Sequence, residues 1–185
     1  CEVDSQIVVN SDTTIQGTSN VVPYNSISGR NRLAPIEIKN GTTLVSHIGI
    51  IKGSSDYGGA MVISGINTVV MLQSCLIANN YASMGGGGIH IFYGSTLFVK
   101  KCTFTGNVGS YRGGGMLVTD GATVFISNST FKENVATRFG GGGLYLSKDC
   151  HVKLMGTYFN GNTAHHHGGA LFGVGGIFDI INSTF

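Results

Sequence analysis

Carboxylates that could carry acid–base chemistry are few in this chain and lie far apart. Cleavage of a polysaccharide requires carboxylates clustered for proton transfer or for a calcium ion. In the repeat described below, only Asp120 and Asp149 fall near one turn, a placement more typical of a solvated loop. We therefore assign no catalytic residue and expect a protein that is not an enzyme, with polysaccharide cleavage as the alternative. The nine acidic residues are Glu2, Asp4, Asp12, Glu37, Asp56, Asp120, Glu133, Asp149 and Asp179.

Three consecutive histidines, His165 to His167, are the feature most suggestive of a metal site. Adjacent side chains in an extended turn point in different directions, and no other His or Cys is clearly placed beside them. We therefore assign no metal-binding residue and no cofactor. The Gly-rich runs do not predict nucleotide binding, because "GGGGIH" lacks the third glycine of a dinucleotide fingerprint and "GGALFGVG" lacks the Lys-Ser/Thr pair of a P-loop.

The histidine turn aligns with two earlier turns of the repeat, Ser110–Arg112 and Thr137–Phe139. Aromatic and cationic residues stacked in this way can form cation–π contacts and a binding rim for a glycan or a protein. A plain solvated turn is the alternative interpretation. As candidate partner contacts, this turn contributes Tyr111, Arg112, Arg138, Phe139, His166 and His167.

Two of the four cysteines, Cys75 and Cys102, lie one repeat apart at equivalent positions. Parallel neighbours in register do not present good disulfide geometry, so we expect two buried thiols rather than a bridge. The sequence leaves open whether Cys1 and Cys150 form disulfides.

Three N-glycosylation sequons begin at Asn40, Asn128 and Asn182. Asn128 and Asn182 occupy the same position of the repeat, at a turn. In a secreted eukaryotic protein these asparagines would carry glycans. Such short motifs also arise by chance in chains rich in Ser, Thr and Asn.

A repeat of about 27 residues positions all of these side chains. Its anchor is an apolar residue, seen most clearly in "FTGN", "FKEN" and "FNGN", and the anchors fall at positions 50, 77, 104, 131, 159 and 185. Gly-Gly followed by an apolar residue recurs in step as "GGAM" at 58, "GGIH" at 87, "GGML" at 114, "GGLY" at 142 and "GGAL" at 168. A unit this short cannot bury its own apolar face, so the units must stack on one another.

The pattern inside each unit is strand-like, with β-branched and aromatic residues alternating between glycine and asparagine turns. We therefore predict an all-β fold, a right-handed single-stranded parallel β-helix of six to seven coils with about 27 residues per coil. One such domain would span residues 1–185, with less regular coils in 1–57 and regular coils in 58–185. Glycine would let every coil turn sharply at the same place. It would also let the backbones of neighbouring coils approach each other there.

Alternation along the strands predicts which side chains form the core. Equivalent inward positions hold apolar residues throughout, and the anchor position provides a ladder of large rings, Phe104, Phe131 and Phe159. The asparagines that follow tolerate left-handed turns, and their amides can hydrogen-bond along the solenoid axis. This second ladder consists of Asn80, Asn107, Asn134 and Asn162.

Two stripes of side chains are expected to point outward, and both are unexpectedly apolar. Such stripes on an exposed sheet indicate a partner or a covering segment, and we add Phe98, Phe125 and Tyr145 to the candidate partner contacts. One stripe contains Met71, Phe98, Phe125, Lys153 and Asp179. The other, on the strand after Gly-Gly, contains Met61, His90, Leu117, Tyr145 and Leu171.

The overall composition excludes several classes of protein. Charged residues make up 11% of the 185-residue chain and the formal net charge is +2, which does not indicate nucleic-acid binding. The sequence contains no window of about 18 apolar residues, so it predicts no membrane span. Because the first residue is Cys1 and the last repeat stops at "INSTF", we expect either a segment of a longer chain or a polymerising subunit.

From about Gly58 to Phe185, the pattern of Gly-Gly-Ala-(apolar) alternating with Phe-x-x-Asn resembles the repeat of the polymorphic outer membrane proteins of chlamydiae. The N-terminal part, with "IVVNSDTTIQG" and "HIGIIKG", is similar to the opening coils of pectin-lyase-like β-helices. The resemblance implies a right-handed β-helix and a surface or secreted role, often adhesive or structural, and it does not identify a ligand.

Taken together, the sequence favours a secreted or cell-surface structural or adhesive solenoid. Its expected partners are other copies of itself, which could assemble into filaments through coil ends and apolar stripes, or a surface protein or glycan. The alternative is a carbohydrate-active β-helix or a glycan-binding module.

Overall fold

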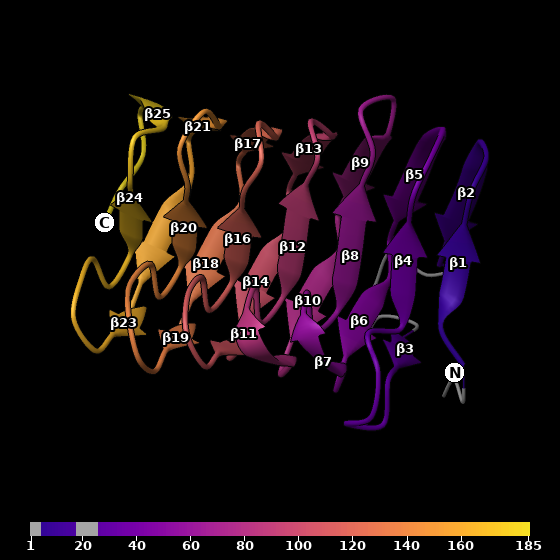
Figure 1. The fold of residues 1–185 in the computed structure, drawn as a ribbon, viewed down its shortest axis with the longest axis horizontal. Helices are drawn as coiled ribbons and strands as arrows, with labels where there is room; N and C mark the ends of the chain where they lie inside the picture. The colour runs from indigo at the N-terminus through magenta and orange to yellow at the C-terminus, as the bar shows by residue number, and fades with distance from the viewer. Residues whose placement is uncertain (1–4, 18–25) are drawn as a thin grey trace.

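The computed structural model describes residues 5–17 and 26–185. Within them the chain winds into a solenoid of about six turns, each of about 27 residues, in which every ladder between strands of neighbouring coils is parallel. Figure 1 shows the coils side by side along the long axis, with the N-terminus and the C-terminus at opposite ends. The described residues form strands and turns and no helix.

One coil contains four strands, and the coil in the middle of the chain illustrates the pattern. It runs through β12 (Ile89–Phe92), β13 (Thr96–Lys100), β14 (Thr103–Thr105) and β15 (Val108–Gly109). These segments are short and rich in β-branched and aromatic residues, as strands require. The chain turns between them at residues with positive φ, among them Gly94, Lys101, Gly106 and Gly113.

Equivalent strands of successive coils form four sheets, which we name after the strands of this coil (Figure 1). The β12 sheet contains β1 (Ile7–Val9), β4 (Ile36–Ile38), β8 (Met61–Ser64), β12, β16 (Met116–Val118), β20 (Leu144–Leu146) and β24 (Leu171–Gly173). The β13 sheet contains β2 (Thr13–Gln16), β5 (Thr42–Ser46), β9 (Val69–Gln73), β13, β17 (Thr123–Ser127), β21 (His151–Met155) and β25 (Ile177–Ile181).

The other two sheets are built from shorter strands. The β14 sheet contains β3 (Ser26–Ser28), β6 (Gly49–Ile51), β10 (Leu76–Ala78), β14, β18 (Thr130–Lys132) and β22 (Tyr158–Asn160). The β15 sheet contains β7 (Ser54–Tyr57), β11 (Tyr81–Gly85), β15, β19 (Val135–Ala136) and β23 (Thr163–Ala164). Strands before and after Gly58 join the same sheets, and the division of the domain at that point stays a prediction.

The predicted period of the anchor residues is confirmed by the strand register. Ile50 pairs with Ile77, which pairs with Phe104, and the ladder continues to Phe131 and Phe159. The three phenylalanine rings stack at centroid distances of 4.4 Å and 4.9 Å, and Phe185 continues the stack at 5.2 Å from Phe159. Burying each such side chain stabilises the fold by roughly 1.5–3 kcal/mol.

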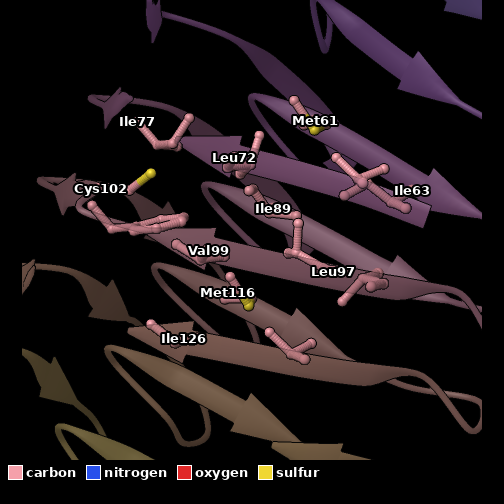
Figure 2. Packing of buried hydrophobic residues seen from close by; sticks show 14 of the residues in the cluster. Met61, Ile63, Leu72, Ile77, Ile89, Leu97, Val99, Cys102, Met116 and Ile126 are labelled. Carbon is pink, nitrogen blue, oxygen red and sulfur yellow. The ribbon is translucent and has the colours of Figure 1, made fainter. Parts of the chain in front are cut away.

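The core fills the interior of the solenoid (Figure 2). The inward residues predicted on the β13 and β14 sheets are buried there, including Leu97, Val99 and Ile77. Cys75 and Cys102 belong to this core as free thiols, as expected, and Cys150 is also a free, buried thiol; Cys1 lies outside the described residues. The hydrogen bond with the neighbouring Cys75, together with burial, raises the pKa of the Cys102 thiol, which keeps it protonated.

The asparagine ladder is confirmed as a chain of buried hydrogen bonds along the axis. The side-chain amide of Asn80 donates to Oδ1 of Asn107 at 2.9 Å, and the same bond joins Asn107 to Asn134 and Asn134 to Asn162. The left-handed conformation is one residue earlier than predicted, at Asn79, Gly106, Glu133 and Gly161. The ladder asparagines are held by burial and hydrogen bonding rather than by turn preference.

The predicted alignment of the Gly-Gly motifs is wrong by one residue in the central coils. Met61 pairs with Ile89, which pairs with Met116, so "GGAM" aligns with "GGGI", "GGGM" and "GGGL". The third residue of the motif is alanine in the first and last copies and glycine in the three copies between them. This difference between copies hid the strand register. The first glycine of each motif has a positive φ, for example 66° at Gly86. The backbone at the second glycine lies close to the backbone of the following coil.

This shift corrects one of the two predicted outward stripes. Met61 and Leu171 were predicted to point outward, but Met61 is buried in the interior, as Figure 2 shows, and Leu171 follows it in the same inward column. The outward column of the β12 sheet consists of Val62, His90, Leu117, Tyr145 and Phe172. The stripe on the β13 sheet has the predicted register, Met71, Phe98, Phe125, Lys153 and Asp179.

Candidate functional site

A groove of about 580 Å³ lies over the outward face of the β12 sheet. Its walls come from that sheet and the turns that follow its strands, from the ends of β7 and β11, and from the loop after β15, and we call it the aromatic groove. A concave site with apolar and aromatic walls and a few polar groups is the usual form of a ligand site. The aromatic groove is lined by Tyr57, Val62, Met84, His90, Phe92, Tyr93, Tyr111, Arg112, Leu117, Thr119 and Asp120.

The chain passes from the β15 sheet to the β12 sheet through glycines with positive φ. Gly86 and Gly113, with φ of 66° and 58°, turn the backbone toward β12 and β16. Side chains that precede such turns contact the outward column of the β12 sheet, Tyr57 at His90 and Arg112 at Tyr145. His90, Leu117 and Tyr145 point outward, yet they are only 7%, 3% and 3% exposed.

His90 is the most enclosed polar residue of the groove. Its ring stacks on Phe92 at 4.5 Å and lies 5.0 Å from the ring of Tyr57. Burial lowers the pKa of His90 to about 4, so the imidazole is neutral at pH 7. Nε2 of His90 is 3.0 Å from Oγ1 of Thr119, while Nδ1 is buried and has no hydrogen-bond partner within residues 5–17 and 26–185.

Arg112 lies at the centre of an aromatic cluster. Its guanidinium carbon is 5.0 Å from the ring centre of Tyr111 and 5.2 Å from those of Phe139 and Tyr145. Such cation–π contacts fix the side chain and keep its charge partly dehydrated. Nε of Arg112 is buried and has no hydrogen-bond partner in the described part of the chain.

Most of the predicted turn patch lies together beside this groove. The rings of Tyr111 and Phe139 stack at 5.8 Å, and His167 contacts Phe139 edge-on at 5.2 Å and stacks on Phe172 at 4.9 Å. Tyr145, which was predicted from the sheet and not from the turn, joins the same cluster.

Arg138 and His166 lie at the margin of this cluster. His166 contacts the rings of His165 and His167 at 4.4 Å and 6.1 Å. Arg138 is exposed, and none of the ring contacts, cation–π contacts or ion pairs found among residues 5–17 and 26–185 involves it. That these residues contact a partner stays a prediction.

Phe98 and Phe125 form a separate surface on the β13 sheet. Their rings stack at 5.0 Å, and Phe98 is 42% exposed. They line a shallow notch of about 210 Å³ together with Val99, Lys100, Ile126, Ser127, Lys153 and Met155. The nine predicted partner contacts therefore fall on two surfaces of the solenoid rather than on one.

Acidic residues do not gather at either surface. Asp120 is the one carboxylate that lines the aromatic groove, and its Oδ2 accepts a hydrogen bond from Thr119 at 3.2 Å. Asp179 pairs instead with His151 at 2.8 Å. Across the described part of the chain, no three His, Cys, Asp or Glu side chains converge as metal ligands would.

The three sequon asparagines, Asn40, Asn128 and Asn182, are exposed. Asn128 and Asn182 share one corner of the coil and adopt positive φ, 46° and 47°. Whether they carry glycans stays a prediction.

Sequence reasoning missed several groove residues, including Tyr57, Phe92 and Thr119. The register of the β12 sheet places Phe92, and the one-residue error in the Gly-Gly alignment hid that register, while Tyr57 reaches the groove from another sheet. An alignment of "GGGI" with "GGAM" would have paired His90 with Val62 and placed both in the outward column of the β12 sheet.

The comparison with protein families agrees with this architecture. The family described as "Right handed beta helix region" matches residues 4–185. The chain belongs to the right-handed β-helix family. No curated protein and no solved structure matches this β-helix. Family membership establishes the fold and its handedness, and it leaves the activity to be argued from the groove.

Among the described residues, this β-helix has no helix of the length and apolar character needed to cross a membrane.

Proposed function

We propose that this β-helix is a structural or adhesive module, secreted or at a cell surface, that binds a glycan in the aromatic groove. The observation that carries the proposal is the groove itself. Aromatic rings line it, and Arg112, His90 and Asp120 supply charged and polar groups between them.

The chemistry of the groove suits a sugar better than a purely apolar ligand. The faces of aromatic rings carry partial negative charge, so they attract the polarised C–H groups of a pyranose ring. Hydroxyl groups both donate and accept hydrogen bonds, so they can satisfy the Nε–H of Arg112 and the carboxylate of Asp120. The parallel coils hold these groups on a rigid scaffold.

The adhesive and extracellular parts of the proposal rest on other features. The sequon asparagines are exposed where an N-glycan could be attached, and the repeat motifs resemble those of bacterial surface proteins. Enzymatic cleavage is the less favoured function, because a single carboxylate lines the groove and acid–base cleavage of a glycan commonly uses a pair.

The test is binding of the chain to a panel of oligosaccharides, with wild type, Arg112→Ala and Tyr158→Ser compared. Tyr158 is an exposed aromatic residue on the β14 sheet, outside the groove, so its variant is the matched control. We expect the Arg112 variant to bind at least about tenfold more weakly and the control to bind normally, since a hydrogen bond to a charged group contributes about 1.5–3 kcal/mol. Absence of binding to every panel member would refute the proposal, and release of shorter products would make the protein an enzyme.

Self-association is a second candidate function, favoured by the stacked Phe98–Phe125 pair, in which Phe98 is exposed and Phe125 is half-buried. Exposed apolar stripes commonly mark protein contacts. We expect wild type to form dimers or larger species in light scattering and Phe98→Ser to shift them to monomers. A wild type that stays monomeric at high concentration would contradict this role.

A further inference from the structure

The hydrogen-bond network behind the aromatic groove fixes where the proton of His90 lies. Oγ1 of Thr119 donates its single hydrogen to the carboxylate of Asp120 at 3.2 Å. The same oxygen lies 3.0 Å from Nε2 of His90, and because a carboxylate is the stronger acceptor for the hydroxyl hydrogen, we assign the hydrogen of this contact to Nε2. His90 is therefore the Nε2–H tautomer, and its Nδ1 has a free lone pair.

Nδ1 of His90 is thus a hydrogen-bond acceptor without a partner among the residues that the structure describes. The residue is more than nine-tenths buried, and a buried polar atom left unpaired is costly, so it marks a place where another molecule supplies the missing bond. Because burial lowers the pKa of His90 to about 4, Nδ1 stays an acceptor throughout the neutral pH range.

The groove has no net charge with which to attract an anion. Its ionised lining residues are Arg112 and Asp120, which have opposite signs, and His90 is neutral. The guanidinium of Arg112 is already engaged with three aromatic rings. A carboxylate on the ligand would be repelled by the lone pair of Nδ1 and by the carboxylate of Asp120, whereas neutral hydroxyl groups can pair with Nδ1, with Asp120 and with the unpaired Nε–H of Arg112.

We infer that the groove selects a neutral, hydroxyl-bearing saccharide over an acidic one, with a ligand hydroxyl donating to Nδ1 of His90. This rests on the proposed glycan-binding function and specifies its ligand class. The ligand hydroxyl reaches Nδ1 by displacing a side chain at the rim. Tyr57, which flanks the His90 ring and is 42% exposed, is placed to move in this way.

The test compares neutral oligosaccharides with uronic-acid oligosaccharides of the same length, by calorimetry at pH 7. We expect neutral ligands to bind about tenfold more tightly than acidic ones, and His90→Phe to weaken neutral binding by about tenfold, the effect of one buried hydrogen bond. Phenylalanine keeps the ring stack with Phe92 and removes both nitrogens. Tyr158→Ser is the control and should bind as wild type does.

Thr119→Val provides a second variant if His90→Phe does not fold. Valine keeps the shape of threonine but removes the oxygen that holds the proton on Nε2, so the proton can move to Nδ1 and abolish the acceptor. Neutral binding should fall by about tenfold in this variant as well. Tighter binding of uronates, or unchanged binding in both variants, would overturn the inference and leave glycan binding intact. If neither ligand class binds, the proposed function itself fails.

Discussion

The guanidinium carbon of Arg112 lies 5.2 Å from the ring centre of Tyr145, although the two residues belong to successive coils and to different segments of the repeat. Arg112 is in the loop between β15 and β16, and Tyr145 is in β20. The contact therefore attaches a loop to the outward face of the next strand of the β12 sheet. It explains how an outward tyrosine comes to be 3% exposed.

Replacing Arg112 should loosen this loop. We expect Arg112→Ala to lower the free energy of unfolding by about 2 kcal/mol, since cation–π contacts of partly dehydrated cations reach that size. Arg112→Lys should recover only part of the loss, because an ammonium group cannot stack flat on several rings. Urea denaturation followed by circular dichroism measures both. Equal stability of the alanine variant and wild type would show that the rings hold the loop without the cation.

The asparagine ladder should be far more sensitive than the turn beside it. Nδ2 of Asn107 donates to Asn134 and to the carbonyl of Ile77, and its Oδ1 accepts two bonds from Asn80. Asn107→Leu removes these four bonds and leaves the buried backbone N–H of Asn80 without its acceptor, so we expect a loss of about 3 kcal/mol or more.

Asn79→Gly is the matched control for the ladder variant. Asn79 is exposed and has φ of 55°, a conformation that glycine adopts without strain. We expect its stability to lie within about 0.5 kcal/mol of wild type. Both variants can be compared in one thermal denaturation series, and a similar loss in the two would mean that the buried amide bonds contribute little.

The sequence predicted the fold well because the solenoid is dictated by local, repeated signals. Phe104, Phe131 and Phe159 recur at the coil period, and their strands need no long-range information to be placed in register. The groove was harder to predict. It depends on which loop side chains cover the sheet, and Tyr57 and His90 meet only through the packing of neighbouring coils. Nothing in their local sequence indicates that contact.

A second limit on prediction came from glycine. The position after Gly-Gly is alanine in the first copy of the motif, at Ala60, and glycine in the next copy, at Gly88, so a search for Gly-Gly pairs matched the wrong residues. The structure shows why glycine is present at Gly88. A Cβ there would lie 2.4 Å from the carbonyl oxygen of Gly115 in the next coil.

That close approach makes Gly88→Ala a sharp test of coil stacking. We expect the variant to lose about 2 kcal/mol of stability, because overpacking against a backbone carbonyl forces the coils apart. Gly121→Asn is the control: a Cβ at Gly121 meets nothing within 4 Å, and asparagine tolerates its φ of 72°. Denaturation curves of the two variants and wild type decide the matter. If Gly88→Ala is as stable as the control, the spacing between coils adapts more readily than the backbone contacts suggest.

His90 should make the stability of the protein depend on pH in a defined window. Its pKa is about 4 in the folded chain and 6.5 ordinarily, so the unfolded chain binds a proton at higher pH than the folded chain does. The stability linked to His90 is therefore complete above pH 6.5, falls as the pH drops from 6.5 to 4, and does not change further below 4. The loss is about 3 kcal/mol across this window.

The variant His90→Phe separates this effect from the titration of carboxylates. Asp120, which is joined to His90 through Thr119, remains in both proteins, so the difference between their stability curves isolates the histidine. We expect that difference to change by about 3 kcal/mol between pH 7 and pH 4, in favour of the variant at low pH. Urea denaturation at half-unit pH steps provides the curves. Parallel curves for the two proteins would show that the folded chain protonates His90 as readily as the unfolded chain does, and the groove would then be more open to water than the buried ring implies.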